Sequence, residues 1–283
     1  SWREARRAGG EGKMLVHLFS DNAPTEDVYS ACALLRENIP DAEYLGSSAS
    51  GNLLDGAVTE HPLVVSAILF EDPSSTAIPH FLPVEDYDAT RFRQALHAFD
   101  FTGVKAAEVV LTIDSVPIYE VCRILEEEIP HSIPIFGGGA FGDNHFAAFV
   151  FAKGTDVQRN GLVLTLYGGE HLYAQNDVVM GWKPLGQPLK VTRASGKVIY
   201  ELDHRPAYEI YHHYLRIPND ANLFYNALEF PFLLESGRVP LLRHALSCGE
   251  DGSLVMSTGI PEGSIIHTTY GDPETILNNV QNS

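Results

Sequence analysis

The N-terminal half of the chain carries a pattern of apolar and polar positions that is typical of alternating strands and helices. Residues 14–19 are almost all apolar, which predicts a strand covered on both faces. The next apolar positions are spaced by four and three residues, so they share one face of a helix between residues 25 and 39: Val28, Cys32 and Leu35. Residues 43–48 and 62–70 predict two further strands, and residues 89–99 predict an amphipathic helix.

The same pattern occurs again 90 positions later. Six residues of the first helix fall on identical residues of the second copy: Tyr29, Cys32, Leu35, Glu37, Ile39 and Pro40 on Tyr119, Cys122, Leu125, Glu127, Ile129 and Pro130. After one inserted residue, Gly46, Ala49 and Gly51 fall on Gly137, Ala140 and Gly142. Strands over 108–113, 146–152 and 161–167 complete the second copy. We therefore expect a duplicated strand–helix–strand–strand unit, with copies at residues 14–100 and 107–170.

The pattern changes in the last third of the chain. Residues 180–188 predict a loop that proline and glycine fix around Trp182. A hairpin over 189–202 and a helix from Ala207 follow. Short apolar runs separated by glycine and proline then predict an antiparallel meander, at residues 229–234, 241–247, 253–257 and 264–270, and a polar helix follows Pro273.

Together these elements predict a mixed α/β fold. A duplicated β-α-β-β unit with mixed sheets and flanking helices is followed by an antiparallel β-meander that forms a second domain. We expect a flexible tail over residues 1–13, an N-terminal domain over 14–204 and a C-terminal domain over 205–283.

Composition and charge exclude several classes of function. With 37 acidic and 19 basic residues the formal charge is −18, and an acidic chain repels phosphate backbones and anionic lipid. We therefore expect no nucleic-acid binding and no membrane insertion, and no apolar run reaches the roughly 20 residues that span a bilayer. Three scattered cysteines fit neither a disulfide framework nor a zinc cluster, which favours a cytoplasmic protein. Cys32 and Cys122 lie on apolar helix faces, where we expect small buried residues.

The densest glycine segment is the first candidate site. Gly137, Gly139 and Gly142 have the spacing of a dinucleotide-binding motif, but an apolar, strand-like segment follows them instead of the helix that such a site needs. We therefore expect a tight turn, whose exposed backbone N–H groups either bind a small anionic or zwitterionic ligand or face solvent. The candidate ligand-binding residues are Gly137, Gly138, Gly139, Asp143 and Asn144, with Ser47 and Ser48 of the first copy.

Two further candidates lie later in the chain. Trp182, between prolines and glycines, either walls a ligand pocket or fills the core as an aromatic residue of a loop. Arg193 either clamps a ligand carboxylate or is a solvated hairpin residue.

Signatures of catalysis and of metal binding are missing from the sequence. It contains no Gly-x-Ser-x-Gly and no Ser-x-x-Lys coupled to a base, so we expect no enzyme activity. The 12 histidines lack metal-site spacing, and the adjacent His212 and His213 would point about 100° apart on a helix. We predict no cofactor, although haem needs only one histidine in an apolar pocket and stays an alternative.

Several motifs resemble those of FIST sensory domains. They are residues 191–207, Val-Thr-Arg-Ala-Ser-Gly-Lys-Val-Ile-Tyr-Glu-Leu-Asp-His-Arg-Pro-Ala, with Gly-Trp-Lys-Pro-Leu-Gly at 181–186, Phe-Gly-Gly-Gly-Ala at 136–140 and Ile-Pro-Glu-Gly-Ser at 260–264. The resemblance covers the chain from about Met14 onward. It implies an N-terminal and a C-terminal FIST half. Because the C-terminal half of the family usually continues past the meander, we expect that half to be incomplete or shortened here. The first glycine segment also has Ser47 where many members have a cysteine.

The resemblance also implies a function. FIST domains are input modules joined to outputs such as diguanylate cyclases, histidine kinases or chemoreceptors in bacteria, and their proposed role is to bind small ligands such as amino acids. We therefore expect a non-enzymatic, cytoplasmic ligand sensor whose partners are a small molecule and an output domain, with a homodimer left open. Two alternatives are a haem-based nitric oxide sensor, as some members are, and a protein–protein adaptor, as in F-box proteins.

Overall fold

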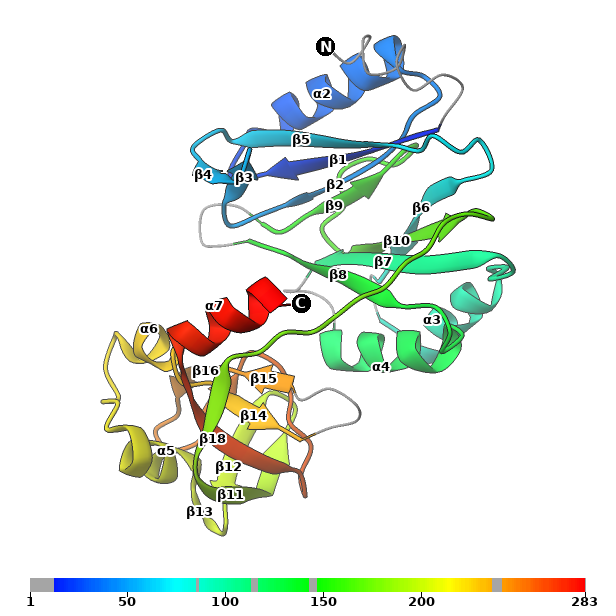
Figure 1. Ribbon diagram of the computed structural model, residues 1–283. Coiled ribbons are helices and arrows are strands. Elements are labelled where there is room, and N and C mark those ends of the chain that lie inside the picture. The colour runs from blue at the N-terminus through cyan, green and yellow to red at the C-terminus, as the bar shows by residue number, and fades with distance from the viewer. Residues whose placement is uncertain (1–12, 85–86, 113–116, 143–146, 236–240, 283) are drawn as a thin grey trace. The chain divides into compact units, whose positions relative to one another are not determined.

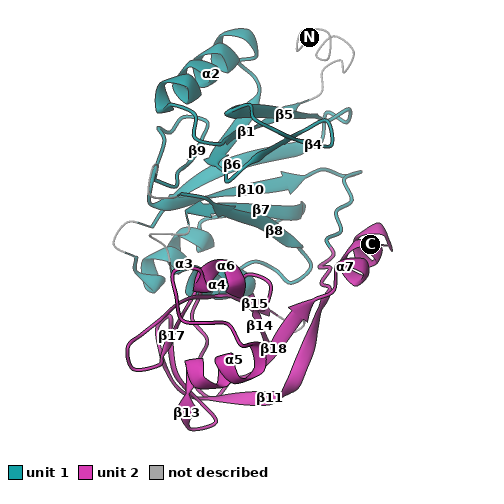
Figure 2. Ribbon diagram, turned by 90° about the vertical axis from the view of Figure 1, so that its left-hand side faces the viewer, with its two compact units in different colours: residues 1–176 teal, residues 177–283 magenta. Residues whose placement is uncertain are grey.

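The chain forms two compact units. The computed structural model describes residues 13–84, 87–112, 117–142, 147–235 and 241–282 (Figure 1), and the units comprise residues 1–176 and 177–283 (Figure 2). The predicted mixed α/β fold is confirmed. The predicted tail lies outside the described residues except for Lys13, and the division predicted at residue 204 stays a prediction.

The first sheet of the N-terminal unit is built around a parallel pair of strands. Its order is β5-β1-β2-β9, with bounds Leu63–Leu69, Met14–Ser20, Glu43–Ser48 and Val150–Ala152. Helix α2 (Thr25–Asn38) joins the parallel β1 and β2 and packs Val28, Cys32 and Leu35 onto one face of the sheet. Because side chains alternate along a strand, Leu15 and His17 of β1 point to the other face.

The second sheet repeats this plan with the second copy of the sequence. Its order is β6-β10-β7-β8, with bounds Thr76–Pro83, Gly161–Gly168, Val104–Thr112 and Ile135–Ala140. Helix α4 (Ile118–Glu128) joins the parallel β7 and β8, and α3 (Ala89–His97) packs beside it on the same face. The sequence repeat therefore corresponds to two β-α-β units, as predicted.

The two sheets pack face to face with the helices outside them, as Figure 1 shows for α2 on one side and α3 and α4 on the other. The core between the sheets contains Leu15, Leu45, Ala106, Val150 and Val163. Strand β9 belongs to the second copy but pairs in the first sheet, and β6 belongs to the first copy but pairs in the second sheet. This exchange of strands makes the two copies one domain.

Several local predictions need correction. The strand expected over 146–152 begins only at Val150, and the sequence did not predict β6 or the hairpin of β3 (Asn52–Leu54) and β4 (Ala57–Thr59). Cys32 is buried as expected, but Cys122 is exposed. Helix α4 buries Val121, Ile124 and Leu125, so the buried stripe is rotated away from Cys122.

The C-terminal unit contains an antiparallel sheet of eight strands that curls toward a barrel. The order is β15-β14-β18-β11-β12-β17-β16, with β13 paired to β12. Strands β15 (Leu241–Arg243) and β16 (Ala245–Cys248) stand at opposite ends of this order although one residue separates them, so the sheet must bend back on itself. The other bounds are β11 Trp182–Ser195, β12 Val198–Leu202, β13 Arg205–Pro206, β14 Phe232–Leu234, β17 Leu254–Met256 and β18 Ile265–Gly271.

The described part of this unit also contains α5 (Ala207–Leu215), α6 (Leu223–Ala227) and α7 (Pro273–Asn282). Tyr211 of α5 is fully buried and packs on Phe232. The loop expected over 180–188 is instead mostly strand, because β11 starts at Trp182, which pairs with Gly271 at the end of β18. The pairing of β11 with β18 is irregular between Leu185 and Leu189. Pro184 lies just before this irregular part and Pro188 lies within it, where a proline is tolerated.

Candidate functional site

Three polar side chains meet between the two sheets of the N-terminal unit. His17 of β1 comes from one sheet, and Glu108 of β7 and Tyr167 of β10 come from the other. His17 Nε2 lies 3.0 Å from both carboxylate oxygens of Glu108, and the Tyr167 hydroxyl donates to Glu108 Oε2 at 2.6 Å. Each of the three residues is 8% exposed. We call this group the inter-sheet triad.

The protonation of the triad follows from its contacts. Burial raises the pKa of the Tyr167 hydroxyl, and the adjacent negative charge of Glu108 raises it further, so Tyr167 keeps its proton and acts as a donor. Because an ionised carboxylate only accepts hydrogen bonds, we assign the donor role in this pair to His17 Nε2. Two donors leave acceptor capacity on the Glu108 oxygens, which have about four lone-pair sites.

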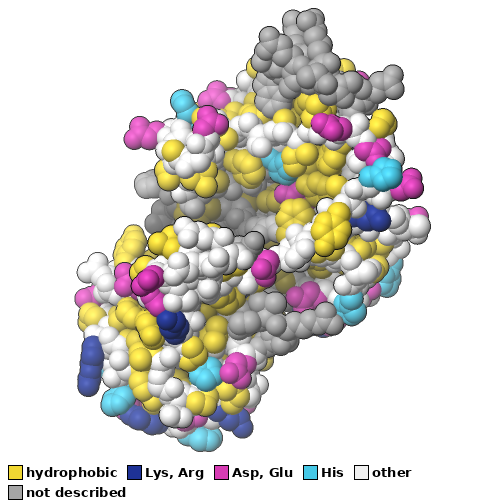
Figure 3. Space-filling model, viewed as in Figure 1, with side chains coloured by type: hydrophobic (Ala, Val, Ile, Leu, Met, Phe, Trp, Pro, Cys, Tyr) yellow, Lys and Arg dark blue, Asp and Glu magenta, His cyan; other side chains and the backbone are white. Residues whose placement is uncertain are grey.

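The two sheets do not cover each other completely around the triad. Phe19 of β1 and Phe136 of β8 are on the facing inner surfaces, yet they are 37% and 43% exposed. Phe19 stacks on the His17 ring with centroids 5.9 Å apart, and Phe136 lies 5.9 Å from the Tyr167 ring. Figure 3 shows this face of the unit hollowed, with hydrophobic side chains around a histidine and an acidic side chain. We call this hollow the inter-sheet cleft.

The predicted glycine turn is a strand. Gly137, Gly138 and Gly139 lie in β8, which pairs in parallel with β7, so the tight turn expected at these residues is wrong. Gly137 has φ +140° and passes so close to β7 that an added Cβ would stand 1.9 Å from the Val109 carbonyl oxygen. Gly138 is on the opposite, inner face beside Phe136, and a Cβ there would meet no described atom within 4 Å. The glycines therefore permit close strand packing on one face and leave room in the cleft on the other.

The serines of the first copy do meet the second glycine segment. The Phe141 N–H, just beyond β8, donates to the Ser48 carbonyl at the end of β2 at 3.2 Å. The Ser48 hydroxyl is occupied by the Phe149 backbone, since the Phe149 N–H donates to it at 3.0 Å. Ser47 alternates to the inner face and is buried between Phe19 and Val150, its partners in the neighbouring strands. The two segments that the repeat singled out thus adjoin.

The remaining candidates lie elsewhere. Asp143 and Asn144 fall outside the described residues. Trp182 and Arg193 belong to the C-terminal unit. Arg193 bonds Glu201 through Nε at 3.0 Å and lies over the Tyr200 ring at 4.4 Å, so its guanidinium already has partners in its own hairpin. The Trp182 indole N–H is buried without an acceptor among the described residues.

Sequence reasoning missed the triad because its members are far apart in the chain. His17 is 91 positions from Glu108, and Tyr167 is 59 positions from it. One signal was available. His17 and Glu108 each lie among apolar residues of a mostly buried strand, and an ionisable residue in such a run needs a partner. Which residue serves as that partner, however, depends on how the two sheets stack.

Neither a metal centre nor a membrane span is found in the described part of the chain. Its His, Cys, Asp and Glu side chains form no group of three or more that could hold an ion. No described helix combines the length and the apolar character that crossing a bilayer requires.

Comparison with known proteins assigns two domain models to the chain. Residues 14–205 match the sequence model described as the FIST N domain, and residues 207–283 match that of the FIST C domain. The chain is also similar to an uncharacterized protein of Methanocaldococcus jannaschii, with 30% identity over 162 residues. That match covers 52% of this chain and 31% of the archaeal protein, so the chain spans about a third of its relative. Because the two domain matches together cover nearly the whole chain and no catalytic domain is among them, the chain belongs to the FIST family of sensory domains.

Proposed function

We propose that the inter-sheet cleft is the ligand site of a signalling input domain, and that it binds a small metabolite with an amino group, such as an amino acid. Binding would regulate a linked output domain, for example a diguanylate cyclase or a kinase, in the cytoplasm. The observation that carries this proposal is the buried Glu108 carboxylate, held by His17 and Tyr167 at the bottom of an aromatic-walled hollow.

Burying three ionisable groups is expensive if they serve only packing. A buried ion pair is often no more stabilising than apolar residues of the same volume, and ionisable clusters in clefts are enriched at functional sites. Glu108 has acceptor capacity beyond its two donors, and an ammonium group has three donors. Phe19 and Phe136 supply apolar surface for the body of the ligand.

The position of the triad also favours a sensing role. His17 belongs to one sheet, and Glu108 and Tyr167 belong to the other, so the hydrogen bond between His17 and Glu108 joins the two layers. A ligand that bonds Glu108 competes with or reinforces this connection. A ligand shifts the equilibrium between two conformations only if it binds one conformation more tightly than the other. Because Tyr167 keeps its proton, its hydroxyl serves as a hydrogen-bond donor in the cleft, which supports a binding role.

The test is a thermal-shift and calorimetric screen of amino acids against matched carboxylic acids that lack the amino group. An amine-bearing ligand present at about 100 times its Kd should stabilise the unit by about 2.7 kcal/mol. Glu108→Gln should abolish the effect, and Glu37→Gln, on the exposed face of α2, should leave it intact. Gly138→Val should also abolish binding, because the valine side chain would occupy the cleft. A Cβ at this position meets no described atom within 4 Å, so the fold should tolerate the change.

Three results would contradict the proposal. The first is no response across a broad amine library. The second is equal binding of the acids without an amine, and the third is unchanged binding in Glu108→Gln. A Soret band after haem loading that is lost in one His→Ala variant would instead favour the haem-based nitric oxide sensor. Capture of a folded protein by the cleft face, with no small ligand, would favour the adaptor.

A further inference from the structure

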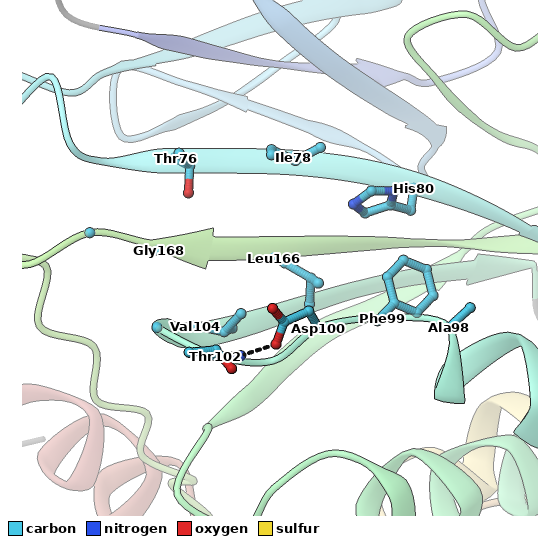
Figure 4. A pocket seen from close by; sticks show the side chains of 12 residues that line it. Thr76, Ile78, His80, Ala98, Phe99, Asp100, Thr102, Val104, Leu166 and Gly168 are labelled. Atoms are coloured by element: carbon cyan, nitrogen blue, oxygen red, sulfur yellow. Dashed lines mark hydrogen bonds between the residues drawn. The ribbon is translucent and has the colours of Figure 1, made fainter.

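A second hollow lies on the other face of the sheet that carries Glu108. Its volume is about 520 Å³, within the range of small-molecule sites. Thr76, Ile78 and His80 of β6 form one wall, Leu166 of β10 lies at the floor, and Phe99 and Asp100 of the segment between α3 and β7 form the opposite wall (Figure 4). We call it the β6–β10 pocket.

The β6–β10 pocket is separate from the inter-sheet cleft because side chains alternate along β10. Leu166 belongs to the core on the helix side of the sheet, whereas the next residue, Tyr167, belongs to the core between the sheets. The pocket and the cleft therefore lie back to back across one strand. Helix α3 ends at His97, before it reaches this part of the sheet, so apolar strand surface stays uncovered and Ile78 is 45% exposed.

The polar groups of the pocket define its charge. Asp100 accepts the Thr102 N–H at 2.9 Å, and hydrogen bonds from Thr102 hold the pKa of Asp100 below its usual range, so this carboxylate is ionised at neutral pH. His80 lies against the Phe99 ring with centroids 4.9 Å apart, and burial lowers its pKa, which keeps the imidazole uncharged. Among the described residues that line the pocket there is no lysine or arginine.

One negative charge beside an apolar strip, with no lysine or arginine among the described lining residues, suits a particular kind of molecule. The ammonium of the ligand would lie near Asp100, and its apolar part would cover Ile78, Leu166 and Phe99. The formal charge of −18 on the chain adds long-range attraction for a cation and repels an anion.

We propose that the β6–β10 pocket is a second small-molecule site of this chain, and that it takes a primary amine or a similar organic cation with an apolar body. This site is distinct from the ligand site proposed for the inter-sheet cleft, and either can exist without the other.

The test uses probes that differ only in their head group. Hexylammonium, hexanol and hexanoate are titrated into the full chain by calorimetry at low ionic strength, where the attraction of partly exposed charges is screened least. Hexylammonium should bind with a stoichiometry of one in Glu108→Gln, in which the cleft has lost its carboxylate. Hexanol should bind more weakly, and hexanoate should not bind.

Two substitutions locate the bound amine. Asp100→Asn keeps an acceptor for the Thr102 N–H but removes the charge, and it should weaken hexylammonium about fivefold, the order expected for one partly exposed ion pair. Ile78→Ala should weaken it roughly threefold through lost apolar contact. Asp251→Asn is the matched control, because Asp251 accepts the Ser253 N–H at 3.0 Å in the same local geometry in the other compact unit.

The outcomes separate the two sites. If Asp100→Asn binds hexylammonium as tightly as the wild type, or if hexanoate binds equally well, the proposal for the pocket is wrong. If Glu108→Gln abolishes all binding, the amine occupies the inter-sheet cleft alone, which overturns the pocket and supports the cleft. Loss of binding in Asp251→Asn to the same extent as in Asp100→Asn would show a non-specific charge effect and would also overturn the proposal.

Discussion

Two neighbouring glycines of β8 provide a sharp test of the structure. Replacing either by alanine adds the same methyl group to the same strand, one residue apart. Gly137→Ala directs the methyl group at the backbone of β7, and Gly138→Ala directs it into open space in the cleft. We expect the first substitution to destabilise the N-terminal unit strongly and the second to have little effect.

The size of the effect follows from the geometry. The Cβ that Gly137→Ala adds would stand 1.9 Å from the Val109 carbonyl oxygen, whereas non-bonded heavy atoms prefer about 3.5 Å. Strand β8 would have to move away from β7, which weakens the pairing that joins Val109 to Gly137. Overpacking of this kind costs about 1–3 kcal/mol, and a side chain at φ +140° adds about 1–3 kcal/mol of backbone strain. A total of about 4 kcal/mol is the expected loss.

Scanning calorimetry and urea unfolding of the full chain measure this difference. For a unit of this size, a loss of about 4 kcal/mol lowers the midpoint by about 8–16 °C. Gly138→Ala should stay within about 0.5 kcal/mol of the wild type, or exceed it slightly, because glycine is unfavourable inside a strand. If the two variants unfold together, β8 is not paired with β7 in this register, and the glycine segment is a turn after all.

Three further predictions concern single residues. Tyr167→Phe removes a donor from the buried Glu108 carboxylate and should cost about 2 kcal/mol in urea unfolding; an unchanged midpoint would mean that water replaces the hydroxyl. Cys122 is exposed and should react with a thiol reagent in the native state, whereas Cys32, whose pKa burial raises, should react only on unfolding. Hydrogen bonds from a lysine and a threonine lower the pKa of Asp272 from 3.8 to about 2, so its contribution to stability is present above pH 4 and lost as the pH falls to 2. Asp272→Asn should therefore be less stable than the wild type at pH 7 and equal to it near pH 2, and a constant difference would refute this.

Much of the secondary structure could be predicted from local patterns. Helices α2 and α4 follow from apolar spacings of three and four residues, and Pro40 and Pro130 indicate where they end. Strands β3 and β4 were missed because each has three residues, too few for a period of two to show. Cys122 was misplaced on the buried face of α4, since its spacing of three residues from Leu125 fits a helical period almost as well as that of the buried Val121, Ile124 and Leu125.

The sequence by itself determined the duplicated plan, the antiparallel C-terminal unit and the family, because periodicity, repeats and motifs can be read from the order of residues along the chain. Only the tertiary structure decided that the glycine segment is a strand and that Glu108 meets His17 and Tyr167. Both outcomes depend on which strands pair and how the two sheets stack. Pairing is a competition between distant segments for the same edge and the same apolar face, and no local pattern records which segment prevails.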